Sequence, residues 1–268
     1  MQKLSAIGDI QTIILDMAKA FHNTCAKYDI PYYMLYGTML GAQRHQGFIP
    51  WDDDIDFGVP FEYYDQLLKA LKEKLPVPYK LITRYDKGGA VGGYLKIVNT
   101  NTLVKENNKV SEDDNTGLFI DIFLLYNERA FKPSLRQFMI KILLMVQHFR
   151  FYRLTGISKL KTVSDKMVKF FFFWLKMPDL INFIEKHLIP SGGRYFTTYS
   201  SIYGKKDFIP SEYYGKPKRY QFEGIELYGV ENSDGYLKHL YGDYMQLPPE
   251  DKRKIHLQEA YILTEGEK

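Results

Sequence analysis

Hydrophobic residues recur at three- and four-residue steps over residues 4–28, which predicts an amphipathic helix. The repeating positions are Ile7, Ile10, Ile14, Met17, Phe21, Cys25 and Tyr28. Pro31 ends this pattern, and Tyr32–Tyr36 then has the aromatic and apolar composition of a strand, with Gly37 marking a turn after it. A second short strand is expected at Ile55–Val59.

The next segments predict a helix and further strands. Phe61–Lys74 places its apolar residues on one face of a helix. The strands are expected at Tyr79–Arg84, Tyr94–Val98, Thr102–Val104 and Leu118–Leu125, with Gly-, Asn- and Asp-rich loops between them. This order of elements indicates an α+β fold with a small mixed sheet.

The second half differs in character. Ser134–Phe151 and Thr162–Leu175 read as helices that are apolar over more than one face and carry interspersed lysines. Farther on, we expect a strand at Gln221–Tyr228 and a helix with Ser233 or Asp234 as its N-cap. We therefore divide the chain into a catalytic core at 1–128, a basic aromatic helical module at 129–190 and a C-terminal region at 191–268 that completes the active-site face.

Charge supports that division. The 268 residues carry a formal net charge of +4, and the segment from Arg129 to His187 alone holds twelve Lys/Arg and three Asp/Glu, or +9. Asp9 and Asp16 lie where a signal peptide would need an apolar run, and no apolar run approaches the roughly 18 residues of a membrane span. The single cysteine excludes an internal disulfide, so we expect a cytoplasmic protein.

The densest chemistry lies in the segment Tyr36–Pro60, YGTMLGAQRHQGFIPWDDDIDFGVP. Asp52, Asp53, Asp54 and Asp56 repel one another unless a cation lies among them. On a strand, Asp54 and Asp56 would point to the same face. Asp121 lies inside the apolar strand candidate, where a buried carboxylate needs a partner such as a metal ion.

Other interpretations of these residues remain open. An aspartate-rich loop can be a solvated turn, and Asp121 can point to solvent. An EF-hand loop is excluded, because numbering from Asp52 puts Phe57 where glycine is required and Tyr63 where glutamate is required. Arg44 can bind a phosphate or pair with Asp52 or Asp53.

The stretch Tyr36–Asp56 closely resembles the signature of the LicD family, whose members transfer phosphocholine from CDP-choline to glycans and are related to the fukutin-type sugar-phosphate transferases. The resemblance continues through Gly117–Leu125 and returns at 241–249, YGDYMQLPP. It implies a nucleotidyltransferase-like core in which a Gly-Thr turn precedes an Asp-x-Asp pair and a third aspartate. In this sequence these are Gly37-Thr38, Asp54 with Asp56, and Asp121.

The resemblance also implies a reaction. Asp54, Asp56 and Asp121 would be catalytic and would hold Mg²⁺, as one or two ions that Mn²⁺ could replace. Gly37, Thr38, Arg44 and Lys96 would hold the phosphates of CDP-choline. The acceptor would be a lipid-linked glycan of the teichoic acid or lipooligosaccharide type, and CMP would be released. An aromatic box for the choline ammonium could draw on many tyrosines, among them Tyr195, Tyr199, Tyr203, Tyr213, Tyr214 and Tyr220.

Three alternatives stand beside this reading. The same carboxylates suit a nucleotidyltransferase or a CDP-ribitol-type transferase, and a non-enzymatic choline or glycan binder would need aromatic residues but no carboxylate triad. No basic stripe lies near the acidic cluster, so a nucleic-acid partner is not expected. The basic module can contact the inner face of a membrane, pack internally or form a dimer interface.

Overall fold

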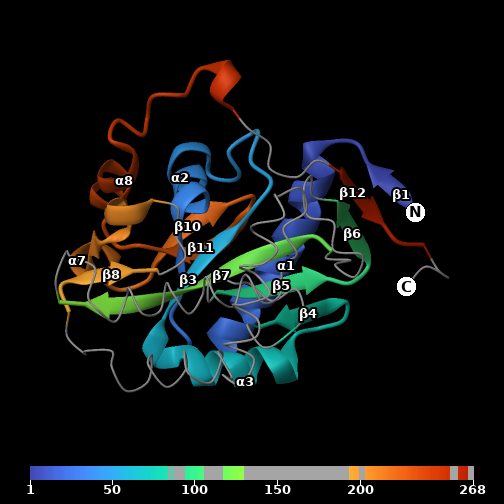
Figure 1. The fold of residues 1–268 in the computed structure, drawn as a ribbon, viewed down its shortest axis with the longest axis horizontal. Helices are drawn as coiled ribbons and strands as arrows, with labels where there is room; N and C mark the ends of the chain where they lie inside the picture. Colours follow the sequence, from blue (N-terminus) through green and yellow to red (C-terminus); the bar gives the residue numbers. More distant parts are fainter. Residues whose placement is uncertain are drawn as a thin grey trace, which may run out of the picture.

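The computed structural model describes residues 1–83, 86, 94–105, 117–129, 193–198, 203–253 and 259–264. Its centre is a seven-stranded mixed sheet, in which five strands follow the order β2-β3-β7-β5-β4 and β8 and β9 extend it from β7 (Figure 1). These strands are β2 (Tyr33–Met34), β3 (Asp56–Pro60), β4 (Tyr79–Ile82), β5 (Leu95–Asn99), β7 (Phe119–Glu128), β8 (Tyr195–Thr197) and β9 (Ile209–Pro210). The strands β3 and β7 run parallel, and the other pairs in this sheet are antiparallel.

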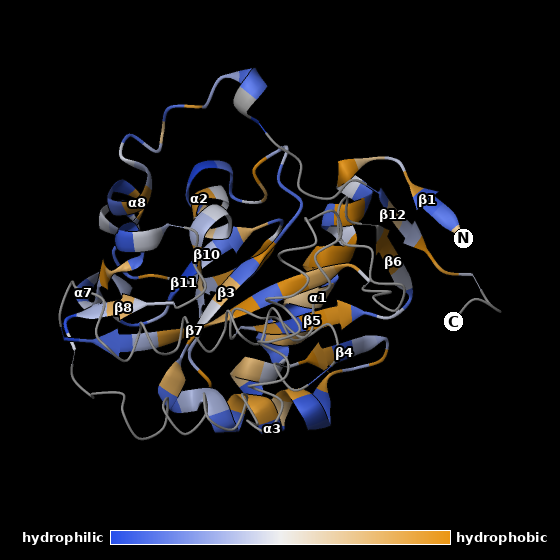
Figure 2. Ribbon diagram, viewed as in Figure 1, coloured by the Kyte–Doolittle hydropathy of each residue, from blue (hydrophilic) through white to orange (hydrophobic). Residues whose placement is uncertain are grey.

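Two helices, α1 (Ile7–Lys27) and α3 (Tyr64–Lys74), contact each other and the sheet. The apolar stripe of α1 is buried as its spacing predicts, and Phe21 stacks on Phe57 of β3 with ring centroids 4.6 Å apart. Figure 2 shows hydrophobic residues concentrated in the central strands β5 and β7. Burial of these apolar surfaces is the main source of the fold's stability.

A second group of elements packs around the β2 side of the sheet. It contains α2 (Tyr36–His45), α7 (Ser211–Tyr214), α8 (Ser233–Tyr241) and the hairpin of β10 (Lys218–Phe222) and β11 (Ile225–Gly229). Short 3₁₀ helices lie at Phe61–Tyr63, Gly204–Asp207 and Glu250–Lys252. The chain ends meet in a separate three-stranded sheet of β1 (Gln2–Leu4), β12 (Glu259–Ile262) and β6 (Thr102–Lys105) (Figure 1).

The predicted mixed sheet with flanking helices is confirmed, but several details were wrong. Gly37 does not mark a turn, because it lies in the first turn of α2. The strand expected at Gln221–Tyr228 is a hairpin whose turn residues, Glu223 and Gly224, both have positive φ. The N-cap of α8 is Asn232, whose side chain accepts a hydrogen bond from the backbone N–H of Gly235 at 2.9 Å.

The expected basic module at 129–190 lies almost entirely outside the described residues, including both of its expected helices. The division into three segments therefore stays a prediction. No helix in the described ranges is long and apolar enough to cross a membrane.

Candidate active site

The sheet brings three of the expected site residues into one row. Asp56 opposes Asp121 in the parallel β3–β7 pair, and Asp121 opposes Lys96 in the antiparallel β5–β7 pair. Because directly opposed residues point to the same face of a sheet, all three side chains share one face. Phe57 faces α1, so alternation along the strand directs Asp56 to the face away from α1.

Asp54 lies two residues before the start of β3, rather than within a strand as expected. The structure nevertheless places it close to Asp56. Burial raises the pKa of Asp56 well above its usual range, and the charges of Asp54, Asp121 and Asp52 raise it further. The mutual repulsion of these carboxylates shows that the chain gathers negative charge at this point of the sheet.

The Lys96 ammonium offsets part of that charge. Its Nζ lies 3.6 Å from Oδ1 of Asp121 and 3.3 Å from the centroid of the Phe119 ring. The positive charge of Lys96 also lowers the pKa of Asp56, which partly offsets the increase caused by burial and the neighbouring carboxylates. Both partners of the ion pair are largely buried, so solvent screens this attraction less than it screens a surface pair.

The first turn of α2 is joined to the carboxylates through Thr38. The Thr38 hydroxyl is buried and accepts a hydrogen bond from the backbone N–H of Asp56 at 2.8 Å. A β-carbon at Gly37 would lie only 2.8 Å from Oδ2 of Asp52, so glycine lets that carboxylate approach the helix start. The N-terminus of a helix favours negative charge, which suits both a carboxylate and a phosphate at this position.

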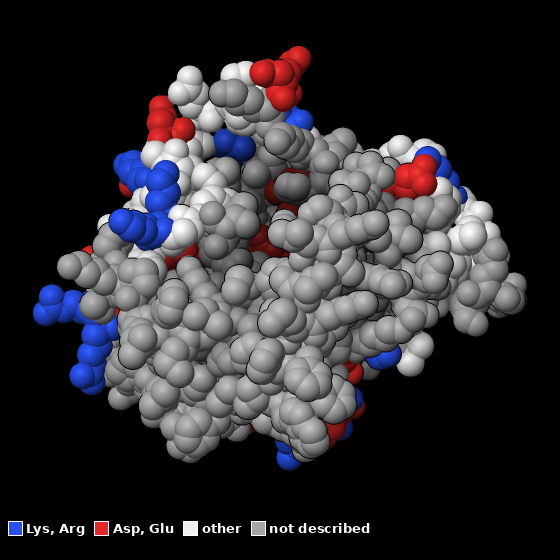
Figure 3. Space-filling view, in the orientation of Figure 1, with Lys and Arg blue, Asp and Glu red and all other residues white. Residues whose placement is uncertain are grey.

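Asp52 was expected as part of the acidic cluster, although the sequence assigned it no catalytic or metal-binding role. Burial and the neighbouring charge of Asp53 raise the pKa of Asp52 to about 6. Its backbone carbonyl accepts a hydrogen bond from the Gln11 side chain of α1 at 2.8 Å, which anchors the acidic loop to the core. Figure 3 shows acidic side chains in a hollow beside α2.

Arg44 lies in the last turn of α2, at the other end of the helix from Thr38. Its guanidinium donates to the carbonyl of Tyr244 at 2.8 Å and to Nε2 of His45 at 2.9 Å. Among its described contacts there is no ion pair with Asp52 or Asp53. A phosphate-binding role for Arg44 stays a prediction that these contacts do not support.

The donor set has the chemistry that a hard divalent cation requires. Mg²⁺ prefers oxygen ligands, and a cation here would relieve the repulsion that raises the pKa of Asp56. Within the described ranges, however, no three Asp, Glu, His or Cys side chains already form a metal site. The carboxylates therefore fit such an ion by charge and type, and they would have to turn toward one another to hold it.

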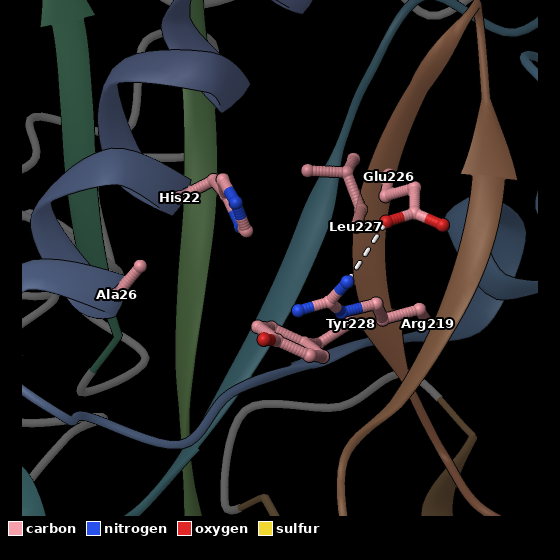
Figure 4. A pocket seen from close by; sticks show the side chains of 6 residues that line it. All are labelled: His22, Ala26, Arg219, Glu226, Leu227 and Tyr228. Atoms are coloured by element: carbon pink, nitrogen blue, oxygen red, sulfur yellow. Dashed lines mark hydrogen bonds and ion pairs between the residues drawn. The ribbon is translucent and has the colours of Figure 1, made fainter.

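A separate pocket of about 250 Å³ lies between α1 and the β10–β11 hairpin (Figure 4). His22 projects into it from α1, opposite Tyr228 and the ion pair of Arg219 with Glu226 at 3.2 Å. The Tyr32 hydroxyl accepts the Tyr228 N–H and lies 2.8 Å from Nδ1 of His22. Because this pocket lies on the α1 side, it is not part of the carboxylate site.

Comparison with known proteins identifies the relatives of this chain. It is 30% identical to the lipopolysaccharide cholinephosphotransferase LicD of Haemophilus influenzae, over 98% of this chain and 100% of that protein. The chain belongs to the LicD family. A family model described as LicD/FKTN/FKRP, nucleotidyltransferase domain, matches residues 29–154, which include Asp54, Asp56 and Asp121.

Shorter matches are found in two rickettsial proteins. Uncharacterised proteins of Rickettsia typhi and Rickettsia prowazekii are 40% and 45% identical to this LicD-family chain. These matches cover 22% and 23% of this chain and 20% and 23% of the respective relatives. Each of these matches therefore covers only a short part of the chain, whereas the Haemophilus protein matches along its whole length.

Proposed function

We propose that this LicD-family protein transfers phosphocholine from CDP-choline to a sugar hydroxyl of a glycan and releases CMP. The observation that carries the proposal is the match, along the whole chain, to a protein named lipopolysaccharide cholinephosphotransferase. The carboxylate row of Asp56 and Asp121, with Lys96 beside it, is compatible with phosphoryl transfer. Such reactions depend mainly on positioning and on stabilising charge.

In the proposed reaction, the acceptor hydroxyl oxygen bonds to the phosphorus that bears choline, and the bond from that phosphorus to the oxygen of CMP breaks. The hydroxyl proton passes to a base. CMP keeps the bridging oxygen and leaves as an anion. The chain has to align the two oxygens and stabilise the negative charge that builds up on the leaving group.

The residues divide these tasks. Asp54 and Asp56 would hold Mg²⁺, with Asp121 either completing that site or receiving the hydroxyl proton. When bound, the ion would neutralise the diphosphate charge. Lys96, whose Nζ lies 3.6 Å from Oδ1 of Asp121, would attract the phosphate oxygens. The first turn of α2 at Gly37 and Thr38 offers backbone N–H groups to a phosphate.

The acceptor that best agrees with the name of the Haemophilus relative is a lipid-linked glycan. The Haemophilus relative is named for action on lipopolysaccharide. A teichoic acid acceptor, a cytoplasmic location and membrane contact by residues 129–190 stay predictions from the sequence.

A donor panel tests the proposal. CMP release would be measured from CDP-choline with Mg²⁺ and a lipopolysaccharide acceptor, beside CDP-ribitol and nucleoside triphosphates. We expect acceptor-dependent CMP release from CDP-choline. Release from CDP-ribitol alone would instead support ribitol-phosphate transfer, and diphosphate release from a triphosphate would support nucleotidyl transfer.

A further inference from the structure

Four aromatic rings form a continuous row on the sheet face that carries the carboxylates. Phe123 lies two residues after Asp121 in β7 and therefore shares its face. Tyr36 meets Phe123 edge-on, with ring centroids 5.6 Å apart, and Tyr203 stacks on Tyr36 at 5.1 Å. Tyr241 closes the row, edge-on to Tyr203 at 5.8 Å.

The inner end of this row is held rigidly. The Tyr36 hydroxyl donates to the buried Asp207 carboxylate at 2.6 Å, and the Tyr36 N–H donates to the Tyr236 hydroxyl at 3.1 Å. Tyr36 starts the same turn of α2 in which Thr38 binds the backbone of Asp56. The aromatic row and the carboxylates are therefore fixed relative to each other by one helical turn.

The outer end of the row is more exposed than its inner end. Tyr36 is 5% exposed, whereas Tyr203 and Tyr241 are both partly exposed. Their hydroxyls lie 2.9 Å apart and hydrogen-bond to each other, which fixes the two rings as a pair. A partly exposed pair of rings beside carboxylates has the properties of a cation site, because a cation is attracted to an aromatic face and to the negative charge.

The electrostatic surroundings agree with this geometry. Burial raises the pKa of Tyr203, and the charges of Asp56, Asp54 and Asp52 raise it further. The same carboxylate of Asp56 contributes to the raised pKa of Tyr241, where burial is again the main cause. Both phenols therefore stay neutral and lie within the negative field of the site.

We propose that Tyr203 and Tyr241 form the wall against which the quaternary ammonium group of the donor binds. The inference rests on the proposed function, because only a choline donor brings such a group to the carboxylates. Two carbons separate the choline nitrogen from its phosphate ester oxygen, so a phosphate held beside Asp54 and Asp56 places the ammonium within a short reach. A trimethylated nitrogen donates no hydrogen bond, so aromatic rings favour it over a primary ammonium, which prefers oxygen atoms and water.

The test compares CDP-choline with CDP-ethanolamine in the presence of Mg²⁺. Dissociation constants from calorimetry, and KM from CMP release, would be measured for wild type and Tyr203→Leu. We expect Tyr203→Leu to weaken CDP-choline binding by about 2- to 30-fold, the range of a single cation–π contact, and to change CDP-ethanolamine binding less. The preference for CDP-choline over CDP-ethanolamine should therefore be smaller in Tyr203→Leu than in wild type.

Two matched variants distinguish the loss of the aromatic ring from a general effect on the fold. Tyr203→Phe loses the hydrogen bond to Tyr241 but keeps the ring, so it should keep the choline preference. Tyr228→Leu makes the same change on the α1 side of the sheet and should leave the preference unchanged. Thermal unfolding would be measured for each variant to check that it folds. If Tyr203→Leu does not fold, Tyr203→Met would be tested instead, with the same ratio of dissociation constants for the two donors.

The ammonium site would be overturned if Tyr203→Leu had the same ratio of dissociation constants for CDP-choline and CDP-ethanolamine as wild type. This holds even if CMP release continues normally. Failure of the proposed function gives a different result. In that case the wild type would bind CDP-choline selectively, in a manner that depends on Tyr203, but it would release no CMP with any glycan acceptor.

Discussion

The Thr38→Val substitution tests the link between α2 and the carboxylate row. The Thr38 side chain is 3% exposed, and its hydroxyl accepts the Asp56 N–H at 2.8 Å. Valine has nearly the same shape, so it removes the acceptor without opening a cavity. A buried N–H left without a partner costs about 1–3 kcal/mol, and we expect the free energy of unfolding to fall by that amount.

We also expect turnover to fall by about tenfold or more, because Asp56 would lose the bond that fixes its backbone at the start of β3. Urea unfolding gives the stability change, and CMP release from CDP-choline gives the activity. Thr38→Ser is the control, because it keeps the hydroxyl and loses only a methyl group, worth about 1 kcal/mol. A valine variant with wild-type stability and turnover would refute this account of how α2 positions Asp56.

Three further predictions concern other parts of the molecule. Gly41→Ala should lower the melting temperature, because its β-carbon would clash with the carbonyl oxygen of Gly47. Gly8→Ala, with open space around it, should raise the melting temperature slightly. Burial, with the Arg219 charge, lowers the pKa of His22, so stability should decrease as pH falls below about 6.5. His22→Gln should reduce that decrease in pH-dependent urea unfolding. Lys96→Met should lower CMP release at saturating donor while the fold is retained by circular dichroism, because the charge beside Asp121 is lost.

The sign of the His22 prediction follows from which state binds more protons. Below about pH 6.5 the imidazole protonates in the unfolded chain before it does so in the folded one. Stability therefore rises with pH between the lowered folded pKa and about 6.5, and is fully present above that window. A His22→Gln variant that loses stability on acidification as steeply as wild type would contradict this assignment.

The sequence predicted those parts of the fold that depend on local pattern. The spacing of apolar residues located α1 to within a few residues, and the apolar run around Asp121 located β7. It could not show that Thr102–Lys105 joins the chain termini in a separate sheet, because strand pairing depends on residues far apart in the sequence. The hairpin turn at Glu223-Gly224 was missed, although a glycine between two alternating runs was a usable signal.

For the candidate site, sequence reasoning selected Asp54, Asp56, Asp121 and Lys96, and the structure brings these four together. It placed Arg44 in the site because Arg44 is close to the aspartates along the chain. In the structure, Arg44 lies in the last turn of α2, whereas Thr38 lies in the first turn. Tyr241 lies far away in the sequence, and its contact with Tyr203 arises only in the folded chain. No local pattern could have linked the two tyrosines.

The most direct test of the central claim compares wild type with Asp56→Asn. The amide removes a buried charge that neighbouring carboxylates oppose, so the variant should be at least as stable as wild type in thermal unfolding. The account predicts that this folded variant loses Mg²⁺-dependent CMP release from CDP-choline by about 100-fold or more, within the range found when a group that stabilises the transition state is removed. A stable Asp56→Asn protein that releases CMP at the wild-type rate would contradict the assignment of the carboxylate row as the catalytic centre.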